Sequence, residues 1–180
     1  MAGRTVDVAL LRRLSPLDGM KNENLAALAR KATGRRIPAF HGRFDEGWDV
    51  IRERWFERQK AMGVVPPNTT LPPRNPGVKA WSELSDNERR FAARLQEAFA
   101  GFLEHTDHHL GRYIDALAAL GQLDNTLFVA MSDNGASQEG GPTGVLDEMR
   151  YFNGLREDVD AAVARLDTIG GPDSHSNYPW

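Results

Sequence analysis

The stretch Thr126-Leu-Phe-Val-Ala-Met131, followed at once by Ser132-Asp133-Asn134-Gly135, decides the fold class of this 180-residue chain. Its first part is a continuous apolar run without polar alternation, which is typical of a strand buried on both faces of a parallel sheet. A long helical pattern and a short polar turn precede the run, and together they form the second half of an α/β unit. The sequence therefore predicts an α/β fold that is mostly helical with at least one buried strand.

The helical pattern before this run is the strongest in the chain. Ser85 with Glu88 three residues later matches a capping box. Apolar residues then recur at helical spacing as far as Leu120, and Gly121 ends the pattern. Gly101 and Gly111 inside this helix would weaken it in isolation, so we expect close packing against a neighbouring segment at both positions.

Two further helices flank a proline-rich connection. Tryptophan and isoleucine spacing predicts a helix over 46–61 capped by Asp45, and a second helix is expected over 157–167. Five prolines within 63–79 exclude both helix and central strand, so an extended surface connection is expected there.

Charge is divided unevenly along the chain, although the net charge is only −3. Residues 1–36 carry eight Lys/Arg against three acids, and the remainder carries a net charge of −8. The basic residues lie within short amphipathic helical patterns and lack interleaved aromatic residues, so we expect no nucleic-acid partner. A short basic helical segment of different origin, residues 1–38, is the simpler interpretation.

Composition excludes several classes of protein. The absence of cysteine rules out disulfides, thiolate metal sites and a cysteine nucleophile. No apolar run approaches the ~20 residues that span a bilayer, and the start of the chain has no export-signal pattern. We therefore expect a cytoplasmic protein without a membrane partner.

Asp133 and Asn134 are the candidate functional residues, because ligands of open α/β sheets bind beyond the carboxyl ends of strands. A carboxylate and an amide oxygen on adjacent residues suit a hard cation such as calcium or magnesium. An ordinary turn is the alternative, since Asp-Asn-Gly is rich in turn formers. Two oxygens also fall short of the six or more that calcium takes.

A histidine cluster is the second place where metal chemistry could reside. His105 and His109 lie four residues apart and could face one metal, as in the helix of zinc proteases. That motif needs Glu directly after the first His, and position 106 is Thr. A charged helix face with pH-dependent pairing, which includes His108, is the favoured interpretation.

From about Phe40 to Trp180 the chain resembles bacterial arylsulfatases of the type-I sulfatase family. The resemblance rests on ordered blocks: Gly42-Arg-Phe-Asp-Glu-Gly-Trp-Asp49, Phe99-Ala-Gly-Phe-Leu-Glu-His-Thr-Asp107, Leu123-Asp-Asn-Thr126 and Met131-Ser-Asp-Asn-Gly-Ala-Ser-Gln-Glu-Gly-Gly141. It implies that residues 39–180 are the central fragment of a catalytic domain with an alkaline-phosphatase-like fold. It also implies calcium as cofactor, with Asp133 and Asn134 as two of its ligands, and hydrolysis of sulfate monoesters by a formylglycine nucleophile.

The departures from the family pattern concern catalysis. The Cys or Ser-x-Pro-x-Arg nucleophile motif is absent, and Ser15-Pro16 has the wrong context. The paired aspartates that complete the calcium site are missing too. We therefore expect no catalytic residue in this chain and no activity by the chain alone, with a sulfate ester as substrate of a completed enzyme.

Residues 10–30 are similar to the helical lead-in of cyclic-nucleotide-binding regulator domains, without the phosphate cassette. A truncated or chimeric remnant would account for both this segment and the missing motifs. A non-enzymatic helical interaction module is the alternative function, based on the amphipathic helices. With one expected strand and no neighbouring strands, we also expect exposed apolar surface and marginal folding.

Overall fold

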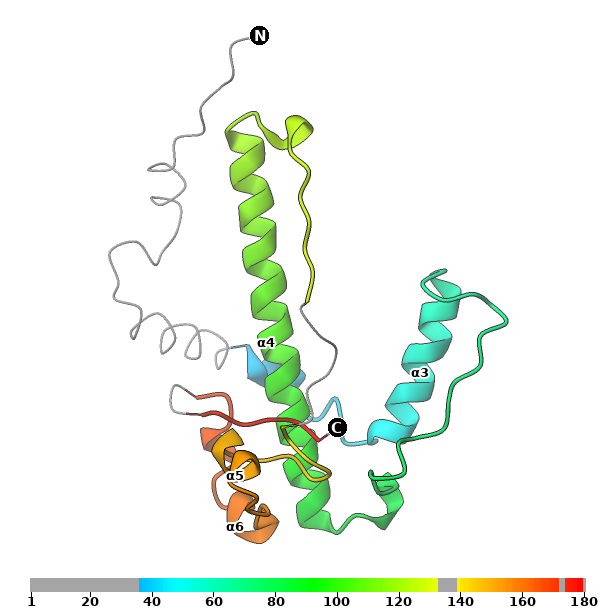
Figure 1. The fold of residues 1–180 in the computed structure, drawn as a ribbon, viewed down its shortest axis with the longest axis vertical. Coiled ribbons are helices and arrows are strands. Elements are labelled where there is room, and N and C mark those ends of the chain that lie inside the picture. Colours follow the sequence, from blue (N-terminus) through cyan, green and yellow to red (C-terminus); the bar gives the residue numbers. More distant parts are fainter. Residues whose placement is uncertain (1–35, 133–138, 172–173, 180) are drawn as a thin grey trace.

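One long helix, α4 (Asp86–Ala119), forms the spine of the molecule in the computed structural model (Figure 1). The structure describes residues 36–132, 139–171 and 174–179. Six short elements and one other longer helix surround the spine: η1 (Ile37–Phe40), α3 (Trp48–Ala61), η2 (Trp81–Glu83), η3 (Leu123–Asn125), α5 (Glu148–Phe152), α6 (Val159–Val163) and η4 (Leu166–Thr168). None of the helices in these ranges has an apolar stretch that could cross a membrane.

The start and end of α4 confirm the sequence prediction. The hydroxyl of Ser85 accepts a hydrogen bond from the backbone N–H of Glu88 at 3.2 Å, and the carboxylate of Glu88 accepts one from the N–H of Ser85 at 2.7 Å. This reciprocal pair satisfies two amides that a helix start leaves without partners. At the other end Gly121 adopts a φ of 64°, which lets the chain turn away from the helix.

The main core packs segments from both ends of the described chain against the first half of α4. Its buried members are Ile37, Phe91, Leu95, Ala98, Ala162 and Ile169. Gly101 is buried on the same face of α4 and lies against Ile37, which confirms the predicted close packing there. The same prediction is wrong for Gly111, because no neighbouring atom of the described residues lies within 4 Å of its Cβ position. The predicted helix over 157–167 is shorter, because α6 ends at Val163 and η4 follows as a separate turn.

A second cluster joins α3 to α4 through the buried side chains of Phe44, Ile51 and Ala93. The helix predicted over 46–61 is present from Trp48, so this prediction is confirmed. The predicted cap at Asp45 is wrong: Gly47 is the N-cap, with a φ of 85° that favours glycine. The proline-rich residues 63–79 form the expected irregular connection, which descends from the end of α3 (Figure 1).

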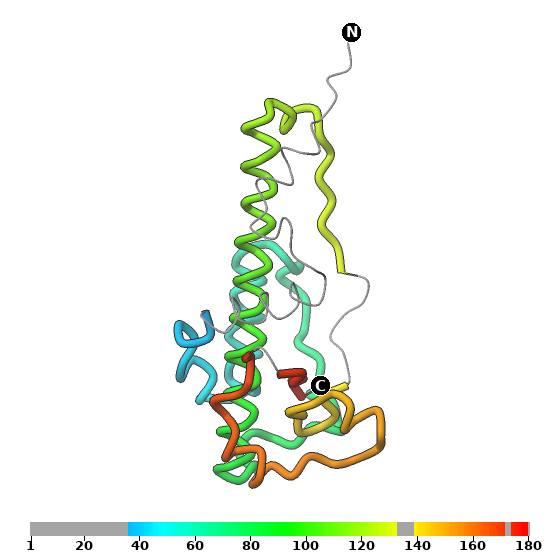
Figure 2. Tube along the Cα trace, turned by 90° about the vertical axis from the view of Figure 1, so that its left-hand side faces the viewer, coloured from blue at the N-terminus to red at the C-terminus, as the bar shows by residue number. Residues whose placement is uncertain are grey.

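The predicted buried strand at 126–131 is not found in this structure. The segment is extended and runs back along α4, but no named strand exists among the described residues (Figures 1 and 2). Leu127 is 90% exposed and Met131 is 85% exposed. A strand buried on both faces requires neighbouring strands and covering helices. The described part of the chain supplies no neighbouring strand, and α4 lies along the segment without burying it. The fold observed here is therefore helical, and the α/β class rests on family resemblance.

Candidate functional site

The two residues predicted to bind metal, Asp133 and Asn134, lie outside the described residues. The structure describes their flanks: Ser132 ends the extended segment, and Glu139 resumes the chain after the gap. No group of three or more His, Asp or Glu side chains within the described ranges is arranged to hold a metal ion. The calcium assignment therefore stays a prediction, and the flanks indicate only how the chain reaches and leaves this point.

Two contacts set the direction of the extended segment, residues 126–132, after the chain leaves α4. The hydroxyl of Thr126 donates to the carbonyl of Gln122 at 2.7 Å, which ties the first residue of the segment to the turn before it. Further along, the rings of Tyr113 and Phe128 lie 6.1 Å apart and connect the segment to the exposed side of the helix. These two contacts direct the chain back along α4 without burying it.

The chain that follows the undescribed residues, from Glu139 onward, contains glycines that pack closely against residues 177–179 and against α4. A Cβ on Gly140 would overlap the carbonyl of Tyr178, and one on Gly144 would overlap Leu95. Val145 and Asn177 exchange two backbone hydrogen bonds of 3.0 Å, which form an antiparallel bridge. The glycine-rich loop therefore needs glycine for steric reasons.

An open cleft of about 1010 Å³ borders this return. Its lining includes Gly140, Gly141, Lys79 and Glu88. Lys79 Nζ donates to Glu88 Oε1 at 2.8 Å, and this hydrogen bond is the main cause of a lowered pKa for Glu88. The carboxylate already serves the capping box of α4, so its charge stabilises the fold rather than awaiting a ligand.

Glu157, the most buried carboxylate of the cleft, is likewise used by the fold. Its side chain is 4% exposed and accepts a hydrogen bond from the N–H of Leu146 at 2.8 Å. Its other oxygen lies 3.4 Å from Nε of Arg150. Asp158 and Asp160 also line the cleft, and they accept hydrogen bonds from the N–H of Ala161 and the side-chain amide of Asn87. Each carboxylate that lines the cleft therefore already takes part in a hydrogen bond of the fold.

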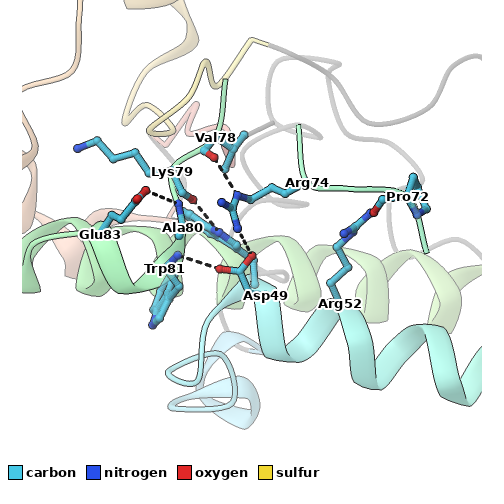
Figure 3. A network of polar contacts seen from close by, with 10 residues as sticks. Asp49, Arg52, Pro72, Arg74, Val78, Lys79, Ala80, Trp81 and Glu83 are labelled. Atoms are coloured by element: carbon cyan, nitrogen blue, oxygen red, sulfur yellow. Dashed lines mark hydrogen bonds and ion pairs between the residues drawn. The ribbon is translucent and has the colours of Figure 1, made fainter. Parts of the chain in front are cut away.

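A polar network that sequence reasoning missed is centred on Asp49, in the first turn of α3 (Figure 3). One carboxylate oxygen pairs with Arg74 at 2.6 Å, and the other accepts from the N–H of Trp81 at 2.9 Å. Arg74 also donates to the carbonyl of Val78 at 2.9 Å. Asp49 thus holds the end of the proline-rich connection against α3. Its only sequence signal is its place at the end of the Gly42–Asp49 block.

The histidine cluster is brought together as the helical spacing predicts. The Nε2 atoms of His105 and His109 lie 3.1 Å apart, and Arg112 Nη1 lies 3.1 Å from Nδ1 of His109. Both histidines have a lowered pKa, primarily because burial penalises the charged ring, with nearby positive groups as further causes. The ring of His108 stacks edge-on to His109 at 5.3 Å.

Comparison with known proteins identifies the family. The sulfatase family matches residues 36–161 of this chain. An uncharacterized sulfatase of Schizosaccharomyces pombe is 43% identical over 101 residues, which make up 56% of this chain and 18% of that protein. An arylsulfatase of Klebsiella aerogenes is 28% identical over 101 residues, which are 56% of this chain and 22% of that protein. An arylsulfatase of Clostridium perfringens is 43% identical over 42 residues, or 23% of this chain and 9% of that protein.

The chain belongs to the sulfatase family, because the match covers more than half of its length. The aligned stretches amount to less than a quarter of each relative. The match begins at residue 36 and gives no support to a relationship between residues 10–30 and cyclic-nucleotide-binding regulators. The proposed boundary at residue 38 stays a prediction, although Ile37 lies in the main core.

Proposed function

We propose that this chain supplies two calcium ligands, Asp133 and Asn134, to the metal site of a sulfuric ester hydrolase. The single observation that carries the proposal is the sulfatase match over residues 36–161, which spans both positions. The chemical types of the two side chains support it, since calcium prefers carboxylate and carbonyl oxygens.

The donor set fits calcium in kind but is incomplete in number. Calcium takes about six to eight oxygen ligands, whereas Asp133 and Asn134 offer two consecutive side chains. The resemblance implies that paired aspartates, which have no counterpart in these 180 residues, complete the set. When bound, the ion would act as a Lewis acid that polarises a sulfate oxygen and orients the ester.

The 180 residues alone are proposed to be inactive toward sulfate esters. They contain no cysteine and no Ser-x-Pro-x-Arg sequence, so the nucleophile of the family has no counterpart in them. Activity then requires a second polypeptide segment that carries the nucleophile and the other calcium ligands.

Complementation tests this proposal. The chain is co-expressed with the Klebsiella aerogenes arylsulfatase from which the matching 101-residue segment has been deleted, and aryl sulfate hydrolysis is measured with calcium present. We expect turnover only when both polypeptides are present. Robust turnover by the chain alone, or a stable complex of the two polypeptides without turnover, would contradict the proposal.

A helical interaction module is the second candidate function. It is favoured by the exposed apolar side chains along the second half of α4, which include Phe102, Leu103, Tyr113 and Ile114. Saturable binding of a partner that is unchanged in Asp133→Ala would support this function over the enzymatic one.

A further inference from the structure

We propose that His105 and His109 form a binding site for a divalent transition metal on the surface of α4, separate from Asp133 and Asn134. The metal class is the one that prefers imidazole, namely Zn²⁺, Ni²⁺ or Cu²⁺. No known feature of the sulfatase match requires this site, and the geometry of the two rings points to it.

The distance between the two ring nitrogens carries the proposal. The Nε2 atoms of His105 and His109 are 3.1 Å apart. Two nitrogens at this separation can both lie about 2.0–2.1 Å from a single ion, with an N–metal–N angle of about 95–100°. That angle falls between the values for octahedral and tetrahedral coordination. The backbone needs no rearrangement, because both residues already lie on one face of a continuous helix.

The tautomers of the free rings show what the metal would replace. The guanidinium of Arg112 can only donate, so Nδ1 of His109 accepts from it and the ring proton lies on Nε2. That proton is then donated to Nε2 of His105. A metal ion would take the place of this shared proton, and the proton would move to Nδ1 of His109, so that the ring stays neutral. Metal binding therefore competes with the hydrogen bond from Arg112.

The charges around the pair set its affinity and selectivity. Arg112 and His108 face it from α4, and Arg36 faces it from the start of η1, where it pairs with Glu104 at 2.9 Å. Residues of the C-terminal segment beside His105, such as Ser174 and Ser176, are neutral. This environment disfavours hard cations held mainly by charge. It permits metals that bind neutral imidazole strongly, with water completing the coordination.

Calorimetric titration of the full untagged chain with ZnCl₂ near neutral pH, repeated with NiCl₂, tests the site. We expect one saturable site that is lost in His105→Gln and in His109→Gln but kept in the matched control His108→Gln, because His108 is not a ligand of the proposed ion. Calcium chloride should give no signal at this site, and Asp133→Ala should leave zinc binding unchanged.

Arg112→Gln provides a readout that a nonspecific histidine effect would not produce. Removing the competing hydrogen bond should tighten zinc binding by roughly fivefold. Helicity of each variant is measured by circular dichroism, so that unfolding is not mistaken for loss of a ligand. Absence of saturable zinc and nickel binding by the native chain, or binding that survives in folded His105→Gln and His109→Gln, would overturn the proposal.

Discussion

Gly101 of α4 lies directly against Ile37 of η1: a Cβ on Gly101 would stand 3.0 Å from Cγ1 of Ile37 and 3.2 Å from its backbone nitrogen. This approach connects the first described segment to the spine of the molecule. Gly111, two to three turns further along the same helix, has nothing within 4 Å of its Cβ position. The two glycines therefore provide a matched pair for testing the packing.

Valine at position 101 should destabilise the chain, whereas valine at position 111 should be nearly neutral. Overpacking against the backbone of Ile37 costs about 1–3 kcal/mol, while position 111 has open space around its Cβ and gains slightly from the loss of glycine's flexibility. The free energy of unfolding is measured in urea by circular dichroism. Equal stability of Gly101→Val and Gly111→Val would contradict the close contact.

Asp49→Ala should loosen the end of the proline-rich connection. The substitution removes the partner of both Arg74 and the N–H of Trp81, at a cost of about 1–3 kcal/mol. Trypsin should then cleave faster after Arg74 and Lys79, as followed by mass spectrometry. Glu53→Ala, an exposed acid on α3, is the control, and the same cleavage rate in both variants would show that Asp49 does not anchor the connection.

Tyr178 makes stability depend on pH at the alkaline end. Burial raises the pKa of Tyr178 to about 12, above its ordinary value of 10.0. The folded state therefore keeps the phenol proton where the unfolded state has lost it, and the free energy of unfolding falls as pH rises through this window. The expected slope is about 1.4 kcal/mol per pH unit.

Comparison with Tyr178→Phe isolates this effect. In urea unfolding experiments across the window, the variant should lose the alkaline decline that Tyr178 contributes. When phenolate absorbance is followed as pH rises, the tyrosine that ionises last in the native chain should be missing from Tyr178→Phe. An identical dependence of stability on pH in the two proteins would show that the phenol is not buried in the folded chain.

The exposed apolar segment at 126–131 should limit the solubility of the isolated chain. Leu127 and Val129 are 90% and 64% exposed, and contiguous exposed apolar surface promotes association. Leu127→Lys with Val129→Lys should raise the concentration at which the chain remains monomeric in light scattering. The same pair should abolish activity in the complemented enzyme, if the segment becomes a buried strand there. Full activity would contradict that role.

Features set by local interactions were predictable from the sequence, and features set by distant ones were not. The capping box of Ser85 and Glu88 depends on neighbours three residues apart, and its prediction is confirmed. Close packing was predicted at both Gly101 and Gly111, but only Gly101 has a close neighbour, because the position of Ile37 depends on a distant segment. The predicted buried strand at 126–131 is not found, because the burial of a strand depends on neighbouring strands. The histidine pair followed helical spacing, whereas its tautomers depend on contacts that spacing does not encode.

The candidate metal residues were found through their position after an apolar run and through family resemblance. The structure adds the path of the flanking chain, but Asp133 and Asn134 themselves lie outside the described residues. The role of Asp49 was missed because its partners, Arg74 and Trp81, are 25 and 32 residues away in sequence.

The most direct measurement is the calcium dependence of aryl sulfate hydrolysis by the complemented enzyme with native chain, Asp133→Ala or Asn134→Ala. If these two side chains hold the ion, each variant should still form the complex but need at least about tenfold more calcium for half-maximal rate, or lose the rate entirely. Unchanged rates with an unchanged calcium requirement in both variants would contradict the assignment.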